Sequence, residues 1–169
     1  METVELIQLV VDRVANCYDK HGLCCSESVV VVLNRVFSAG FEDRAMMQMA
    51  AGYCHGIGGA GCSCGSLTGA VMILSTFLGH HQKDGLSKNS FRKGVLRLHD
   101  EFRTKFGSTC CRVLSKKVKH DKIQHHTNCL MLTKGGAEIA TSILLELRPD
   151  LLHVADKLFL LSKEYPITD

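Results

Sequence analysis

A glycine-dense turn with two cysteines is the segment whose residue types and spacing point most directly to chemistry. Residues 58–69 read Gly-Gly-Ala-Gly-Cys-Ser-Cys-Gly-Ser-Leu-Thr-Gly, and an apolar run over residues 70–78 follows at once. Such a run is typical of a buried helix, so Cys62 and Cys64 lie near a loop-to-helix joint. The free N–H groups and the positive dipole of a helix start favour the thiolate, which binds metals and attacks disulfides. The sequence therefore predicts thiol chemistry at this turn.

The composition indicates which kinds of thiol chemistry to expect. The chain has 169 residues, nine cysteines and a net charge of +3, and this length suffices for one domain with a hydrophobic core. The N-terminus is unlike a secretory signal, and the longest aliphatic run, residues 29–33, is too short to cross a membrane. We therefore expect a cytosolic protein, in which many cysteines favour metal or redox chemistry over structural disulfides. The small net charge and the 6% aromatic content argue against nucleic-acid binding.

Apolar residues recur every three or four positions along almost the whole chain, which predicts helices rather than strands. We predict one all-α domain over residues 1–169, a compact bundle of about six to eight helices. The expected helices cover residues 4–18, 26–37, 43–53, 64–79, 87–106 and 129–147. A short turn is expected near Cys110, a basic connector over residues 116–128, and a last helix from Pro149.

Helical phase separates cysteines that face inward from their neighbours. Adjacent helix residues point about 100° apart, so both members of an adjacent pair cannot face the core equally well. Cys25 is in line with the valines of its helix, whereas Cys24 is in line with Ser28 and Arg35. Cys25 is therefore the inward member of this pair.

The same test selects three further cysteines. Cys64 and Cys129 each head an apolar stripe, and Cys111 is slightly favoured over Cys110. With Cys25, they are expected at or just before four helix starts, facing inward. Four thiolates in such places predict a tetrahedral sulfur cage, suited to zinc or to an iron–sulfur cluster.

Several alternatives remain open at this point. Cys62 and Cys64 could cycle between dithiol and disulfide, although a single intervening residue makes a strained ring. The metal could be a structural zinc ion that ties helix starts together. Cys24, Cys62 and Cys110 are reserve ligands beside predicted ones, and buried cysteines can also act simply as small hydrophobes.

Other motifs carry less weight. Residues 56–61 match G-x-G-x-x-G, but their surroundings are helical, whereas a dinucleotide site needs a preceding strand. His55 is the histidine best suited to donate a proton or to serve as a spare ligand. A basic run could dock an acidic redox partner; its residues are Lys116, Lys117, Lys119 and Lys122.

The selected cysteines, with the segment Cys64-Gly-Ser-Leu-Thr-Gly, resemble the redox-active C_GCAxxG_C_C family, named for its C…CGAxxG…C…C pattern. Cys25 matches the first family cysteine, Cys64 the cysteine of the CGAxxG box, and Cys111 and Cys129 the third and fourth. Ser66 replaces the alanine of the box. The resemblance covers nearly the whole chain and implies a helical, redox-active protein. The domain is also similar to part of split-Soret cytochromes, which implies an iron–sulfur centre on these four positions.

Residues and resemblance together predict an electron-transfer or redox-sensing protein with an iron–sulfur centre, of [2Fe–2S] type in the favoured version. Zinc is the alternative metal. We expect Gly61, Gly65 and Gly69 to let backbone and neighbouring helices approach the centre closely. The expected partner is a redox protein, rather than a nucleic acid or a membrane, and the broad apolar helix faces could also pair in a homodimer. Whether the protein is an enzyme stays open.

Overall fold

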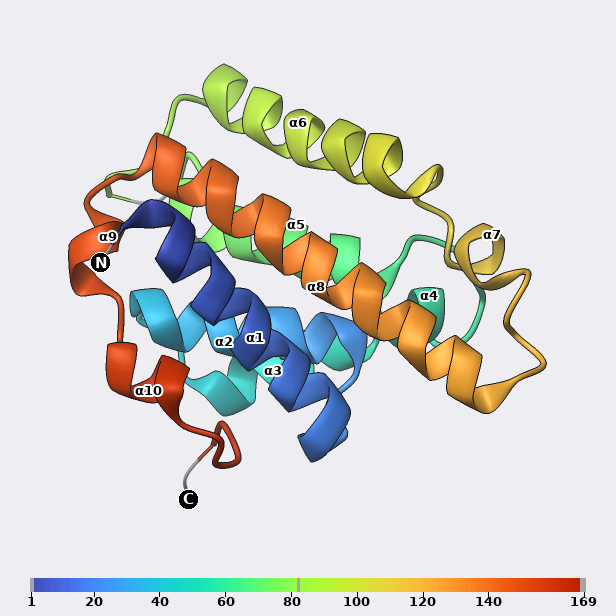
Figure 1. Ribbon diagram of the computed structural model, residues 1–169. Helices are drawn as coiled ribbons and strands as arrows, with labels where there is room; N and C mark the ends of the chain where they lie inside the picture. Colours follow the sequence, from blue (N-terminus) through green and yellow to red (C-terminus); the bar gives the residue numbers. More distant parts are fainter. Residues whose placement is uncertain (1, 82, 168–169) are drawn as a thin grey trace.

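The computed structural model describes residues 2–81 and 83–167, and within them the regular secondary structure is helical (Figure 1). The longer helices are α1 (Thr3–His21), α2 (Cys25–Phe37), α3 (Asp43–Ala51), α5 (Gly65–Leu78), α6 (Lys88–Phe106) and α8 (Lys122–Leu147). The short ones are α4 (Cys54–Ile57), α7 (Cys111–Ser115), α9 (Leu151–Val154) and α10 (Lys157–Leu161). Over the same residues no strand forms, and no helix has the length and apolarity needed to span a bilayer. The predicted all-α fold is confirmed.

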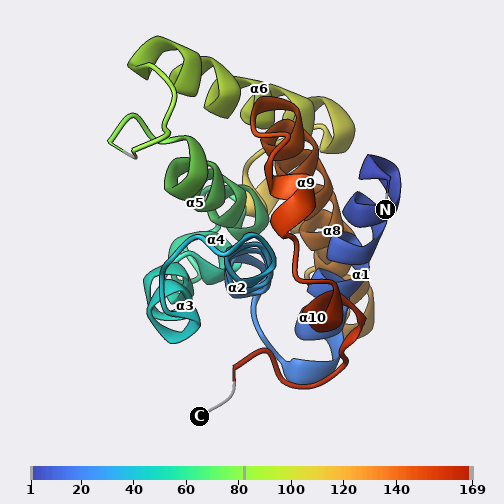
Figure 2. The same cartoon turned by 90° about the vertical axis from the view of Figure 1, so that its left-hand side faces the viewer.

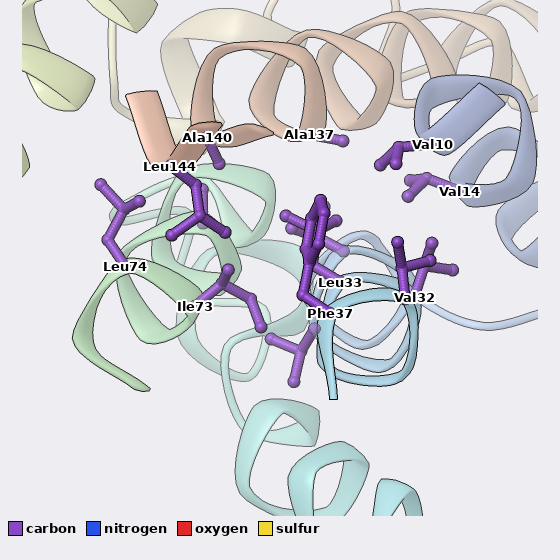
Figure 3. Close-up of a cluster of buried hydrophobic side chains, with 14 of the residues drawn as sticks. Val10, Val14, Val32, Leu33, Phe37, Ile73, Leu74, Ala137, Ala140 and Leu144 are labelled. Carbon is purple, nitrogen blue, oxygen red and sulfur yellow. The ribbon is translucent and has the colours of Figure 1, made fainter. Parts of the chain in front are cut away.

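Helix α2 is the centre of the packing. Residues 29–33 are each fully buried, at 0% exposure, and a helix that is apolar on all sides is typical of a core element. It packs against α1, α3, α5 and α8, and Figure 2 shows it nearly end-on among them. The core side chains drawn in Figure 3 include Val32, Leu33 and Phe37 of α2, Ile73 and Leu74 of α5, Ala137, Ala140 and Leu144 of α8, and Val10 and Val14 of α1.

Small residues bring α5 close to both α2 and α8. A Cβ at Gly69 would lie 2.8 Å from the carbonyl oxygen of Ser26, so the backbones of α5 and α2 nearly touch there. On the other side of α5, Ser66 Oγ donates a hydrogen bond to the carbonyl of Leu132 (2.7 Å) and lies against Gly136. These approaches place the N-terminus of α5 between α2 and α8.

Helix α8 begins seven residues earlier than predicted, which corrects the position of Cys129. Asp121 is its N-cap, and the Asp121 carboxylate accepts the backbone N–H groups of Ile123 (2.9 Å) and Gln124 (3.0 Å). Residues 122–128 were expected in a connector because they are polar. Polar side chains are nevertheless compatible with the exposed turns of a capped helix. Cys129 therefore lies inside α8 rather than at its start.

The C-terminal region also differs from the expected single helix after Pro149. It forms α9 and α10, separated by Ala155 in an extended conformation (φ −58°, ψ 125°). Asp156 then caps α10 by accepting the N–H of Phe159 (2.9 Å). A capping aspartate in mid-segment starts a new helix instead of continuing the old one.

Candidate functional site

The four cysteines selected by helical phase line one cavity of about 220 Å³. They come from positions spread over more than a hundred residues, and Figure 1 shows α4, α7 and the start of α8 gathered at one end of the molecule. The other lining residues are Tyr18, Gly22, Leu23, Cys24, His55, Gly65, Ser115, His125, His126 and Leu132. Tertiary structure thus brings together the residues that the sequence places far apart.

Three of the four cysteines lie at helix starts, as predicted. Cys25 is the first residue of α2, Cys64 is the N-cap of α5, and Cys111 is the first residue of α7. Cys64 is buried, and the other three cavity cysteines, Cys129 among them, are half-buried. Their sulfurs are therefore largely withdrawn from solvent.

Backbone hydrogen bonds join the glycine–cysteine turn to the segment before α7. Cys64 N–H donates to the carbonyl of Thr109 (2.8 Å), and Cys111 N–H donates to that of Cys62 (2.6 Å). Arg112 extends this pairing with a bond from its N–H to the carbonyl of Gly61 (3.0 Å). Because these bonds fix the two segments side by side, Cys64 and Cys111 are held close to each other at the cavity.

The glycines before Cys62 permit a left-handed backbone. His55 and Gly56 have φ values of 54° and 70°. A Cβ on Gly56 would lie 2.6 Å from the Cβ of Cys111 and 2.8 Å from the backbone nitrogen of Cys62. Only glycine avoids both the strain of a positive φ and the steric overlap of a Cβ at this position. This winding directs the backbone N–H of His55 at the sulfur of Cys25.

Other hydrogen-bond donors also point at the cavity sulfurs. Cys64 accepts bonds from the backbone N–H groups of Ser66 and Leu67, in the first turn of α5. Tyr18 shares a hydrogen bond with the sulfur of Cys129. Donors of this kind stabilise negative charge on sulfur, including that of a metal-bound thiolate.

The spacing of the sulfurs tests which metal group they fit. Three or more histidine, cysteine or acidic side chains could share one metal ion where their ligand atoms all lie within 4.8 Å of one another. Among the described residues, Cys24, Glu27 and Cys54 form such a group. No three of the cavity cysteines meet that distance. A single tetrahedral zinc with bonds of about 2.3 Å needs sulfurs only about 3.8 Å apart. The cavity cysteines would therefore have to move closer together to bind one such ion.

Comparison with known proteins gives the family. The model of the family described as "Putative redox-active protein (C_GCAxxG_C_C)" matches residues 23–143, from just before α2 into α8. The chain belongs to this family. The matched region contains all four cavity cysteines, and the resemblance inferred from them is confirmed at the level of the family. The comparisons with curated proteins and with solved structures gave no match.

Burial governs the protonation of the family cysteines in the metal-free protein. Burial, reinforced by neighbouring cysteines, raises the pKa of Cys64 to about 12 and that of Cys129 to about 11. The pKa values of Cys25 and Cys111 are also raised, chiefly by burial. The expectation that the helix start would make Cys64 a thiolate is therefore wrong for the metal-free protein, because burial outweighs the two N–H bonds. A metal ion would have to displace these protons on binding.

We expect the reduced, metal-free protein to lose stability as the pH rises above 9. A buried thiol whose pKa is higher in the folded than in the unfolded chain stabilises the fold at pH values below the unfolded pKa of 9.0. Cys17, whose pKa burial raises to about 11, contributes in the same way as Cys64 and Cys129. This stability is lost between pH 9 and about 12, at about 1 kcal/mol per thiol for each pH unit. Urea denaturation at pH 8 and pH 10 measures the difference. An unchanged free energy of unfolding would contradict the burial of these thiols.

A disulfide between Cys24 and Cys54 was not anticipated from the sequence. The Cα atoms are 5.9 Å apart, and the bond joins the N-cap of α2 to the first residue of α4. From the sequence, Cys24 is a reserve metal ligand, and structural disulfides are disfavoured because a cytosolic protein is expected. The pairing of Cys24 with Cys54 corrects the role given to Cys24. No spacing signal could reveal it, because it depends on α4 folding back onto the start of α2.

Two other cavity residues, Tyr18 and His125, were missed. His125 Nε2 lies 3.8 Å from the sulfur of Cys129, and its ring stacks on that of His55 at 6.4 Å between centroids. His55, the histidine singled out from the sequence, lines the cavity as well. The i,i+4 spacing of His125 and Cys129 would have placed both on one helix face, had residues 122–128 been predicted as helical.

The three predicted glycines have different positions. Gly65 lines the cavity, and a Cβ there would overlap the sulfur of Cys25. Gly69 lies against the backbone of Ser26, and Gly61 lies against Arg112. Gly65 thus borders the site directly, whereas Gly69 and Gly61 position its walls. Neither Cys62 nor Cys110 is among the cavity-lining residues.

Proposed function

We propose that this redox-active family member holds an iron–sulfur centre on Cys25, Cys64, Cys111 and Cys129 and serves in electron transfer or redox sensing. The observation that carries the proposal is the convergence of these four cysteines on one cavity. A [2Fe–2S] cluster is the proposed type. One-electron redox chemistry is what such a cluster supplies when bound.

The chain itself would tune the centre. The N–H groups of His55, Ser66 and Leu67 aim at ligand sulfurs, and hydrogen bonds of this kind raise the reduction potential of a cluster. Leu23 and Leu132, 7% and 4% exposed, line the cavity and restrict water. Partial exclusion of solvent is a further means by which a protein sets the potential.

Two alternatives receive less support from the structure. A structural zinc module would need three or more of the cavity cysteines to move closer together than they lie in the metal-free structure. A dithiol of Cys62 and Cys64 needs two thiols that meet, yet Cys62 is exposed outside the cavity while Cys64 is buried in its wall. Both alternatives nevertheless give distinct experimental results.

Anaerobic purification followed by metal analysis separates the three functions. We expect visible absorption together with bound iron and acid-labile sulfide, because four thiols around one cavity match the ligand set of such clusters. Colourless protein with bound zinc would support the structural module. Protein without metal, but with a titratable Cys62–Cys64 dithiol, would support the oxidoreductase, and either result would overturn the iron–sulfur proposal.

The surroundings of the cavity suggest how a partner would dock. Lys116, Lys117 and Lys119 are exposed in the segment between α7, which carries Cys111, and α8, and Lys122 is exposed at the first position of α8, which carries Cys129. We propose that an acidic redox protein binds this basic segment, since complementary charge steers association. A single domain over residues 1–169, a cytoplasmic location and pairing as a homodimer remain predictions from the sequence.

A further inference from the structure

We infer that the Cys24–Cys54 disulfide is a second redox site, which exchanges with an external dithiol and controls access to the four-cysteine cavity. This inference goes beyond the proposed function and does not depend on a bound cluster. It starts from two sequence neighbours: Cys24 directly precedes Cys25, and Cys54 directly precedes His55. The disulfide therefore ties together the two segments whose next residues line the cavity.

The tie maintains a specific contact at the cavity. The backbone N–H of His55 points at the sulfur of Cys25, and this requires α4 to stay beside the start of α2. A covalent bond between residues 24 and 54 holds the two segments at that distance. Breaking the bond removes the only covalent link between them apart from the intervening chain.

Helix α4 is poorly able to keep its position without the disulfide. It has four residues, and His55 and Ile57, neither of them glycine, have positive φ values of 54° and 64°. Backbone conformations of this kind persist only where surrounding structure holds them. Reduction should therefore loosen α4 and expose the wall of the cavity that carries Cys25.

The disulfide is placed where a thiol can reach it. Cys24 and Cys54 are both half-buried, and the disulfide is most accessible from the side of Cys54, whose two neighbours Tyr53 and His55 are exposed. The hydroxyl of Ser26 lies 3.3 Å from the sulfur of Cys24 and 3.4 Å from that of Cys54. The Ser26 hydroxyl donates its proton to the carbonyl of Ala50 (2.9 Å), so it is the N-terminus of α2, with Cys24 as its N-cap, that can stabilise negative charge on a departing Cys24 sulfur.

The exchange balances with a dithiol as reductant. One thiolate of the external dithiol attacks a sulfur of the disulfide, the Cys24–Cys54 bond breaks, and a mixed disulfide forms. The second external thiol then releases the protein. Cys24 and Cys54 each end with a proton, two electrons have entered this chain, and the external dithiol has become a disulfide.

The test is thiol labelling of the metal-free, natively folded protein across a series of dithiol/disulfide buffers. We expect Cys24 and Cys54 to become labelled by iodoacetamide together, in one two-electron transition, while circular dichroism shows the helices intact. Labelling of both cysteines in the air-oxidised protein would contradict the disulfide. Continued blocking in excess dithiol would show a purely structural bond.

A double variant tests the coupling to the cavity. Cys24→Ser with Cys54→Ser cannot form the bond, and we expect its Cys25 to be labelled roughly tenfold faster than in the oxidised natural protein. Cys62→Ser, outside both the pair and the cavity, is the matched control and should leave the Cys25 rate unchanged. An equal Cys25 rate in the double variant and the oxidised protein would overturn the coupling. Because no metal is present, these results are independent of whether the cluster exists.

Discussion

Cys64→Ser is expected to lower the iron content of anaerobically purified protein by at least about tenfold, whereas Cys62→Ser should leave it unchanged. The two positions are two residues apart in one turn, but Cys64 is 4% exposed in the cavity wall and Cys62 is exposed outside it. A serine oxygen is a poorer ligand for iron in a sulfur site than a thiolate. Iron and sulfide analysis, with the visible spectrum, measures the effect.

The paired design makes the result specific to the cavity. Both variants remove one thiol from the same turn, so the loss of one cysteine would affect them alike; because Cys64 is buried, circular dichroism must also show that Cys64→Ser keeps its helices. Equal iron in Cys64→Ser and the natural protein would remove Cys64 from the ligand set, even if a cluster is present. Loss of iron from Cys62→Ser alone would move the assignment to that residue.

Gly69→Ala is expected to destabilise the metal-free protein by up to about 2 kcal/mol. The added Cβ would lie 2.8 Å from the carbonyl oxygen and 3.1 Å from the Cα of Ser26, both rigid backbone atoms. Overpacking of this kind costs about 1–3 kcal/mol, which the better helix propensity of alanine, about 1 kcal/mol, offsets only in part. Urea denaturation measures the change in the free energy of unfolding.

Gly94→Ala is the matched control, because Gly94 is also a helical glycine. A Cβ there meets only Leu147 Cδ1 at 3.5 Å, an ordinary contact, so the variant should gain about 0.5–1 kcal/mol. Since α2 and α5 carry Cys25 and Cys64, Gly69→Ala should also bind less iron, and Gly94→Ala should not. Stabilisation of both variants alike would show that α2 and α5 are not as close as described.

Most of the helices could be predicted because their signals are local. The apolar spacing and the glycines after helices give α1, α2, α5 and α6 to within about three residues. The start of α8 was missed because the polar composition of residues 122–128 was given more weight than the capping aspartate Asp121. This one error also placed Cys129 at a helix start and left His125 in a connector.

The sequence by itself determined the helical class and the family, and helical phase selected four cysteines, since phase and motif spacing are properties of neighbouring residues. The tertiary structure decided what those cysteines meet. It brought Cys25, Cys64, Cys111 and Cys129 to one cavity and paired Cys24 with Cys54. It also showed that burial, rather than the helix start, sets the pKa of Cys64. These outcomes depend on how α4, α5, α7 and α8 pack around α2, and packing between distant segments leaves no periodic signal in the chain.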